Sequence, residues 1–159
     1  QDYEQTVVAK DLQNKKEALI QYIEDNGIVV AICGGFQLLG RYYVNASGER
    51  LNGISAIDVC TNGQFPNRLI GDVEIFNEEF GETYLGYENH IGRTYLGKNM
   101  KPLGKVVKGY GNNEEDHAEG CLYKNVFCSY FHGPILVRNQ HLTDRIIQTA
   151  AQRRLEKNA

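Results

Sequence analysis

The stretch "VVAICGGFQLLG" (29–40) decides the fold, because it runs from an apolar segment through a cysteine and two glycines into a helical pattern. Residues 27–33 are β-branched and nearly free of charge, which favours a strand covered on both faces, as in a parallel sheet. The glycine pair 34–35 permits a tight turn. Residues 36–42, Tyr42 included, then continue as a short helix. Strand, turn and helix in this order predict an open α/β sheet.

Cys33 lies at this turn, and two interpretations of it are open. A free cysteine is a common core residue. A thiol between the carboxyl end of a strand and the start of a helix instead lies where α/β proteins bind ligands, and the helix N–H groups there stabilise a thiolate. The second interpretation predicts a nucleophile.

The rest of the chain fits a single domain, residues 1–159, because no linker interrupts it. Residues 3–25 have helical spacing with a stop at Asn26-Gly27, and residues 142–157 form a final helix that Thr143 or a neighbour could cap. The predicted strands of the second half are residues 71–77, 83–90, 105–111, 120–131 and 134–139.

Composition excludes several classes of protein. The chain has 159 residues and a net charge of −3 without a basic stripe, so nucleic acid is not an expected partner. No apolar run approaches the roughly 20 residues that span a bilayer, and we expect a soluble cytoplasmic protein without a membrane span. The cysteines at 60, 121 and 128 form no metal-binding or disulfide pattern with Cys33, so we expect free packing residues and no metal.

A thiol nucleophile needs a base, and the chain offers four histidines. His132 follows the strand-like "CSYF", and in a parallel sheet it would reach the same edge as Cys33. A surface-loop position is the alternative for His132. His90 in "GYENHIGRT" also ends a strand and is the rival base. His117 lies in an acidic loop that we expect to be solvated, and His141 is expected in the loop before the last helix.

Two polar residues are candidates for substrate binding. Arg68 leads into an apolar strand and could hold a carboxylate through a bidentate fork, although a surface arginine is the alternative. Gln37 lies four residues after Cys33, on the same helix face. It could hydrogen-bond a polar substrate group, or it could be exposed.

Three motifs in order resemble one family. "AICGGFQLLG", "GYENHIGRT" and "YFHGPILVRN" are similar to the nucleophile, strand-loop and histidine motifs of class I glutamine amidotransferases, in the subgroup related to cobyric acid synthase. "QDYEQTVVAKDL", "PNRLIGDV" and "ENH", where cobyric acid synthases usually have "EIH", resemble the subgroup's small glutaminase subunits that serve cell-wall synthesis. The resemblance implies a flavodoxin-like open sheet.

The resemblance also implies a role for each candidate residue. Cys33 would attack the side-chain amide of L-glutamine, with His132 as the proton carrier and the Gly34 N–H as an oxyanion donor. Arg68 would anchor the glutamine carboxylate, and Gln37 would line the pocket. Ammonia would pass to a Mur-ligase-like partner in a heterodimer, which amidates D-glutamate of lipid II in peptidoglycan synthesis. No cofactor is expected in this subunit, whereas ATP and Mg are expected in the partner.

Two departures from the family pattern leave alternatives open. The family's first strand and its glycine-rich oxyanion loop would precede Gln1, so we expect a domain that is incomplete at its N-terminus. Pro134 occupies the place, two residues after His132, where many class I enzymes carry an acid, so a Cys–His dyad is implied. The glutaminase portion of cobyric acid synthase and a non-catalytic docking subunit are the alternative functions.

Overall fold

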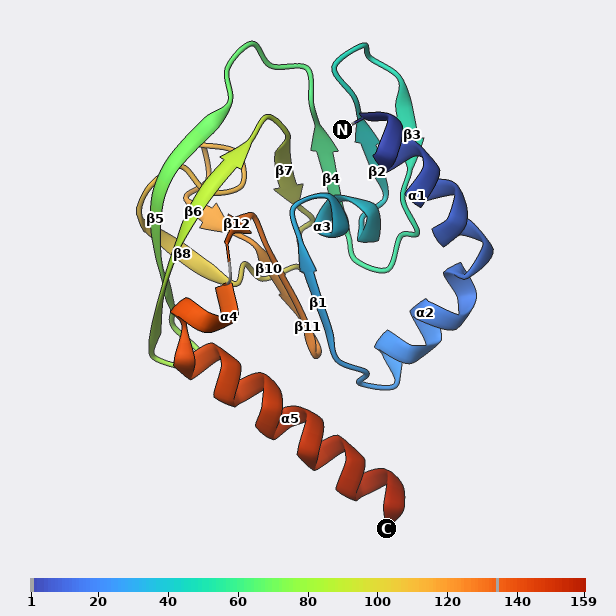
Figure 1. Cartoon of the computed structure of the whole chain (residues 1–159), viewed down its shortest axis with the longest axis vertical. Helices are drawn as coiled ribbons and strands as arrows, with labels where there is room; N and C mark the ends of the chain where they lie inside the picture. Colours follow the sequence, from blue (N-terminus) through green and yellow to red (C-terminus); the bar gives the residue numbers. More distant parts are fainter. Residues whose placement is uncertain (1, 134) are drawn as a thin grey trace.

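The computed structural model describes residues 2–133 and 135–159, which form a mixed α/β fold with curled sheets (Figure 1). Pro134 lies outside the described residues. The helices are α1 (Asp2–Asn14), α2 (Lys16–Glu24), α3 (Gly34–Leu39), α4 (Ile135–Arg138) and α5 (Gln140–Asn158). The strands are β1 (Val29–Ile32), β2 (Tyr42–Val44), β3 (Arg50–Asn52), β4 (Val59–Asn62), β5 (Leu69–Asn77), β6 (Glu82–His90), β7 (Arg93–Leu96), β8 (Gly104–Lys108), β9 (Ala118–Glu119), β10 (Cys121–Tyr123), β11 (Val126–Ser129) and β12 (Phe131–His132). The predicted α/β class is confirmed.

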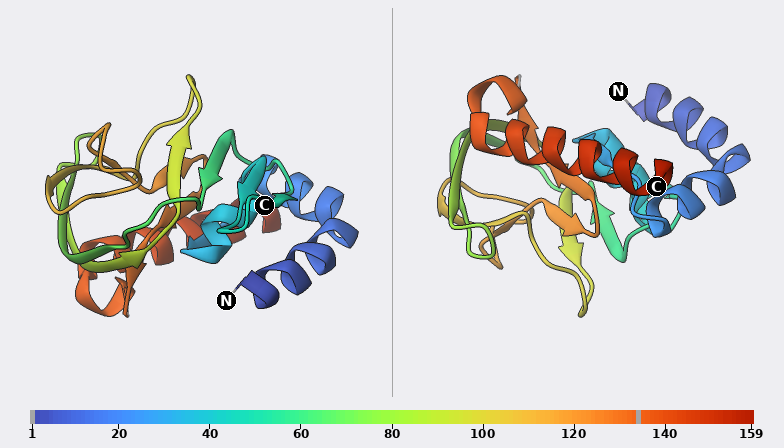
Figure 2. Two further views of the ribbon diagram at one scale, coloured as in Figure 1. Left: turned by 90° about the horizontal axis from the view of Figure 1, so that it is seen from above. Right: turned by 90° about the horizontal axis from the view of Figure 1, so that it is seen from below.

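The strands form three sheets, in the orders β1-β11-β10, β12-β6-β5-β8-β9 and β3-β2-β4-β7. Strand β1 is parallel to β11, as its sequence predicted, and β2 is parallel to β4. The predicted cover on both faces of β1 is not found in the described residues, because Val30 is 39% exposed. The longest pair is antiparallel, since β5 and β6 run beside each other from Leu69 opposite His90 to Asn77 opposite Glu82. Helices α1 and α2 lie at one side of the molecule and the curled β5–β6 pair at the other (Figure 2).

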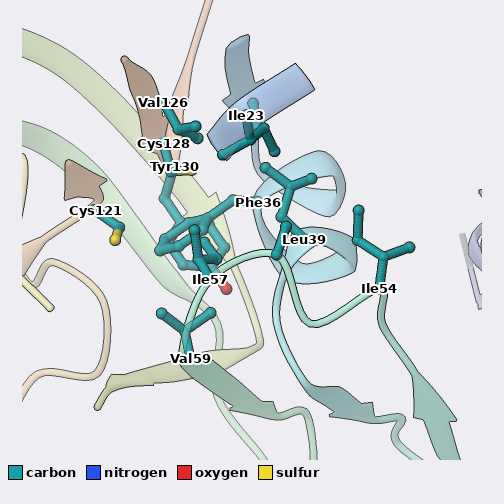
Figure 3. Close-up of a cluster of buried hydrophobic side chains, with 12 residues drawn as sticks. Ile23, Phe36, Leu39, Ile54, Ile57, Val59, Cys121, Val126, Cys128 and Tyr130 are labelled. Carbon is teal, nitrogen blue, oxygen red and sulfur yellow. The ribbon is translucent and has the colours of Figure 1, made fainter. Parts of the chain in front are cut away.

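Two clusters of buried apolar side chains hold these layers together. The first packs Ile23 of α2 and Phe36 of α3 against Tyr130, which follows β11 (Figure 3). The second joins Phe131 to Leu142 of α5 and to the inner face of the β5–β6 pair. Because Tyr130 and Phe131 belong to different clusters, the segment that leads to His132 is anchored from both sides.

The segment 134–139 was predicted as a strand, and that prediction is wrong. Its residues 135–138 form α4, because Asn139 ties this turn to β6. The Asn139 side chain accepts a hydrogen bond from Leu85 N at 2.7 Å and donates to Leu85 O at 2.8 Å and to Ile135 O at 2.8 Å. These bonds occupy backbone groups that another strand would need. A tertiary contact therefore overrides the strand propensity of "ILV".

The helix after Cys33 is shorter than predicted. It ends before Gly40, where an added Cβ would lie 2.7 Å from Val59 Cγ2, so the chain makes a close approach that requires glycine. Tyr42 consequently belongs to β2 and not to the helix. It pairs there with Cys60 of β4.

The last helix is confirmed as α5, but its start differs from the prediction. Asn139 is the N-cap residue, without a side-chain capping bond, and Thr143 instead donates from Oγ1 to Asn139 O at 3.2 Å within the helix. His141 therefore lies in the first turn of α5 and not in a loop. Of the apolar side chains of α5, Leu142 is buried, whereas Ile147 is 60% exposed. None of the helices in the described ranges combines the length and the apolar character that crossing a membrane requires.

Candidate active site

Strands β1 and β11 bring Cys33 and the His132 segment to the same end of one sheet. Ile32 is opposite Ser129 in the parallel register, and the Cys33 N–H donates to Ser129 O at 2.9 Å. Both segments leave the sheet beyond this pair. The first continues into α3, and the second passes through Tyr130 into β12, where His132 is opposite Tyr87 of β6. This register agrees with the expectation that the segments of Cys33 and His132 reach the same edge of a sheet.

Cys33 adopts a backbone conformation that L-residues rarely occupy. Its φ is 53° and its ψ is −107°, directly before the first residue of α3. A residue in this region carries roughly 1–3 kcal/mol of strain, which the surrounding structure must hold in place. The Cys33 N–H bond to Ser129 O and the Gln37 N–H bond to Cys33 O, at 3.1 Å, fix the turn from both sides. Such a strained strand-to-helix turn is the geometry of a nucleophile elbow.

The environment of the Cys33 thiol raises its pKa. Burial is the main cause, and it outweighs two influences that lower the pKa, namely the hydrogen bond from the Gly34 backbone and the positive charge of Arg68. The predicted stabilisation of a thiolate at the helix start therefore lowers the pKa of Cys33, but by less than burial raises it. A thiol with a raised pKa is protonated at neutral pH, so nucleophilic attack requires a base.

His132 is half-buried, and its ring is oriented by a backbone carbonyl. The distance between His132 Nε2 and Asn89 O is 3.0 Å. Because a carbonyl oxygen can only accept, Nε2 carries a proton and a neutral ring keeps its lone pair on Nδ1. Within residues 2–133 and 135–159, the ring makes no hydrogen bond with the Cys33 thiol. Direct proton transfer between the two groups stays a prediction.

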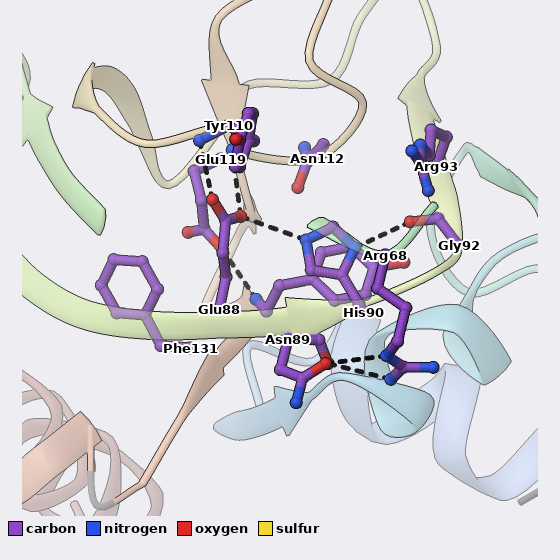
Figure 4. Close-up of polar contacts among 12 residues, drawn as sticks. Arg68, Glu88, Asn89, His90, Gly92, Arg93, Tyr110, Asn112, Glu119 and Phe131 are labelled. Atoms are coloured by element: carbon purple, nitrogen blue, oxygen red, sulfur yellow. Dashed lines mark hydrogen bonds and ion pairs between the residues drawn. The ribbon is translucent and has the colours of Figure 1, made fainter. Parts of the chain in front are cut away.

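Arg68 is exposed and bound to the same residue as His132. Its Nε donates to Asn89 Oδ1 at 2.8 Å, and its Nη2 lies 3.4 Å from Asn89 O (Figure 4). The positive charge of Arg68 is one of the influences that lower the pKa of the Cys33 thiol. Arg68 and His132, which lie far apart in the sequence, thus both contact Asn89.

Gln37 is buried, so the alternative of an exposed side chain is wrong. Its Nε2 donates to the Tyr130 hydroxyl at 3.0 Å. The Tyr130 hydroxyl also bonds Thr94 Oγ1. An added Cβ at Gly92 would lie 2.7 Å from Gln37 Nε2, so only glycine leaves room for this amide. Gln37 therefore joins α3 to the polar interior behind Cys33.

The other histidines have different surroundings. His90 is 2% exposed and stacks on Tyr130, with ring centroids 3.9 Å apart. Its Nδ1 lies 2.8 Å from Gly92 O, and its Nε2 lies 3.1 Å from Glu88 Oε2. With both nitrogens engaged inside the protein, His90 is not placed to act as a base on a substrate. His117 is exposed, as predicted.

Sequence reasoning missed a pair of buried carboxyl groups beneath the site. Glu88 accepts hydrogen bonds from Tyr110 N at 2.7 Å and Gly111 N at 3.1 Å. Glu119 accepts from Tyr130 N at 2.7 Å and from the Ser129 hydroxyl, and burial raises its pKa to about 8. The period-two alternation of β6 offered a signal, because it places Glu88 and His90 on one face and Asn89 on the other.

The remaining cysteines are free, and Cys121 and Cys128 are buried in the core, as predicted. Cys60 is half-buried in β4. In the part of the chain that the structure describes, histidine, cysteine, aspartate and glutamate side chains form no group of three or more that could hold a metal ion.

Comparisons with known proteins show the family of this chain. A family model of the CobB/CobQ-like glutamine amidotransferase domain matches residues 1–140, so the chain belongs to this family. A solved structure described as a glutamine amidotransferase has the same fold, with a TM-score of 0.63 at 16% identity over 92% of this chain and 75% of that chain. The resemblance to class I glutamine amidotransferases and the predicted fold are confirmed.

Particular relatives are more similar. The chain is 56% identical to the lipid II isoglutaminyl synthase (glutamine-hydrolyzing) subunit GatD of Streptococcus pneumoniae, over 97% of this chain and 59% of the relative. It is 43% identical to the GatD subunit of Staphylococcus aureus, over 96% of this chain and 61% of the relative. A probable cobyric acid synthase of Methanothermobacter thermautotrophicus is 36% identical over 66% of this chain and 23% of the relative. The chain thus spans about three-fifths of the length of the two GatD relatives.

Proposed function

We propose that this chain is the catalytic part of a glutaminase that uses Cys33 and His132 to hydrolyse L-glutamine. The observation that carries the proposal is the strained backbone of Cys33, whose φ is 53°. Cys33 follows β1, and the parallel strand β11 runs towards the same end of the sheet before the chain reaches His132. Strain of this kind clusters at active sites and persists only where the surrounding structure holds it in place.

The proposed reaction begins with the Cys33 sulfur, which attacks the side-chain amide carbon of glutamine. The thiol proton moves to His132 Nδ1, while the Gly34 N–H stabilises the oxyanion of the tetrahedral intermediate. One such donor is worth about 3 kcal/mol of barrier. The C–N bond then breaks, ammonia leaves with the proton from His132, and a thioester to Cys33 remains. Water hydrolyses the thioester, releases glutamate and restores the thiol.

Arg68 is proposed to bind the α-carboxylate of glutamine through its guanidinium group, which is exposed and lies within electrostatic range of Cys33. Gln37 would form the wall behind the nucleophile. Its hydrogen bond to Tyr130 fixes α3 against the core and so holds the Cys33 turn.

We infer that the ammonia serves a Mur-ligase-like partner that uses ATP and Mg to amidate D-glutamate of lipid II in the cytoplasm. Two relatives with 56% and 43% identity carry the name lipid II isoglutaminyl synthase subunit. The lower identity of 36% to a probable cobyric acid synthase makes corrinoid amidation the second candidate. Copurification of the native protein with a Mur-ligase-like subunit supports the first, whereas amidation of a corrinoid acid by the purified protein supports the second.

The test of the chemistry compares Cys33→Ala with Cys60→Ala in the full-length protein together with its partner. Both cysteines are half-buried, which makes the second variant a matched control. We expect Cys33→Ala to abolish ammonia release from glutamine and labelling by 6-diazo-5-oxo-L-norleucine, a diazoketone analogue of glutamine. Cys60→Ala should keep both. Equal ammonia release by the two variants would reject the proposal and favour a non-catalytic docking subunit.

A further inference from the structure

We propose that Asn89 is a positioning residue that holds the substrate-binding and proton-transfer groups of this site in one arrangement. The inference rests on the proposed function. Its basis is that a single residue of β6 binds both groups. The Asn89 side-chain oxygen accepts from Arg68 Nε at 2.8 Å, and its backbone oxygen lies 3.0 Å from His132 Nε2.

The position of Asn89 is set by its two neighbours. Glu88 is 0% exposed and His90 is 2% exposed, and they pair with each other at 3.1 Å on the inner face of β6. Asn89 points to the other face because side chains alternate along a strand. Figure 4 shows Asn89 and the guanidinium group of Arg68 on the opposite side of the strand from Tyr110. The residue between two buried anchors is thus a rigid support for Arg68, whose own side chain is exposed and long.

The bond to Asn89 restricts the conformations of Arg68. An exposed arginine otherwise samples many rotamers, and ordering it on substrate binding costs free energy. The Nε bond to Asn89 Oδ1 orients the plane of the guanidinium group before the substrate arrives. The charge of Arg68 already reaches the Cys33 thiol in this arrangement. Asn89 therefore sets where a carboxylate binds relative to the sulfur.

The two contacts of Asn89 are separable by mutation. Asn89→Ala removes Oδ1, which accepts the short 2.8 Å bond from Arg68 Nε, but it keeps the backbone oxygen, which accepts from His132 and makes the longer 3.4 Å contact with Arg68 Nη2. We therefore expect the KM for glutamine to rise by about tenfold, equivalent to about 1.4 kcal/mol. The kcat should change by less than about threefold, because the Asn89 backbone oxygen, which accepts the hydrogen bond from His132 Nε2, remains.

Labelling of Cys33 in the full-length protein with its partner distinguishes positioning from a general structural role. 6-Diazo-5-oxo-L-norleucine carries the amino-acid carboxylate, whereas iodoacetamide lacks it. In Asn89→Ala, labelling by the diazoketone should slow by about tenfold, while labelling by iodoacetamide should stay within about twofold of the native rate. Asn99→Ala, which replaces an exposed asparagine, is the matched control and should change neither rate.

A double-mutant cycle completes the test. If Asn89 acts through Arg68, adding Asn89→Ala to Arg68→Ala should not slow diazoketone labelling any further. Additive effects, or an equal slowing of iodoacetamide and diazoketone labelling in Asn89→Ala, would overturn the inference. Failure of the proposed function has a different signature, because the native protein itself would then show no glutamine-protected labelling of Cys33 and no ammonia release.

Discussion

Replacing Glu88 by glutamine should destabilise the fold, because this carboxyl group is fully buried and accepts two backbone hydrogen bonds. The donors are Tyr110 N at 2.7 Å and Gly111 N at 3.1 Å, and the His90 ring lies beside the same carboxyl group, with Nε2 at 3.1 Å from Oε2. The substituted amide has one oxygen and one NH₂ group. When its oxygen keeps the bond from Tyr110, its NH₂ group faces the Gly111 N–H, and two donors then oppose each other.

The magnitude follows from these contacts. A buried N–H without an acceptor costs about 1–3 kcal/mol, and the hydrogen bond that is lost contributes a further net stability of about 0.5–1.5 kcal/mol. Since a neutral His90 ring with its proton on Nδ1, facing Gly92 O, can accept from the new NH₂ group at Nε2, we expect a net loss of about 3 kcal/mol in the free energy of unfolding. For a chain of this size, that loss corresponds to a fall in Tm of roughly 6–12 °C.

Thermal and urea unfolding of the full-length protein provide the assay. The control is Glu78→Gln, which makes the same chemical change in a carboxylate that pairs with Lys105 at 2.8 Å but is 64% exposed. An exposed ion pair contributes at most about 1 kcal/mol, so this variant should unfold within about 3 °C of the native protein. Equal unfolding free energies for Glu88→Gln and Glu78→Gln would refute the view that buried Glu88 anchors β6.

Three further predictions concern pH and packing. Because burial raises the pKa of Cys33, the rate of its alkylation by iodoacetamide should still climb at pH values where an ordinary thiol has levelled off; a plateau at lower pH would contradict the burial effect. The folded-state pKa of Glu119 is about 8, above its ordinary value of 4.5, so Glu119 binds a proton more tightly in the folded state and stability should fall as pH rises from about 4.5 to about 8. The stability of Glu119→Gln should lack this part of the pH dependence, and an unchanged pH profile of stability in this variant would contradict the raised pKa of Glu119. Gly86→Ala should destabilise the protein by about 1–3 kcal/mol, because the added Cβ would lie 2.4 Å from the Phe131 ring beside His132; Thr83→Ala, on the exposed part of the same strand, is the control, and equal stability of the two variants would argue against this packing.

Much of the fold was predictable because its signals are local. The apolar run before Cys33, the glycine pair after it and the helical spacing of the first and last segments each predict an element from neighbouring residues alone. The same local signals failed for residues 134–139. The side chain of Asn139 there binds the backbone of Leu85, 54 positions earlier, and this contact favours α4 over a strand.

The candidate site was predictable only in part. The sequence motifs pointed to Cys33, Arg68 and His132, and the parallel register of β1 and β11 agrees with the expected edge. Asn89 escaped prediction because asparagine in a strand has no chemistry of its own to mark it. Its importance comes from hydrogen bonds to Arg68, 21 positions away, and to His132, 43 positions away.

Residue order alone was enough to establish the strand–turn–helix around Cys33, since backbone preferences and apolar periodicity act between near neighbours. The raised pKa of Cys33, the burial of Gln37 and the convergence on Asn89 emerged only from the folded chain. Burial and hydrogen bonding depend on which distant segments come together. That information resides in the packing of the sheets, because no local pattern records the partner of a buried or bridging side chain.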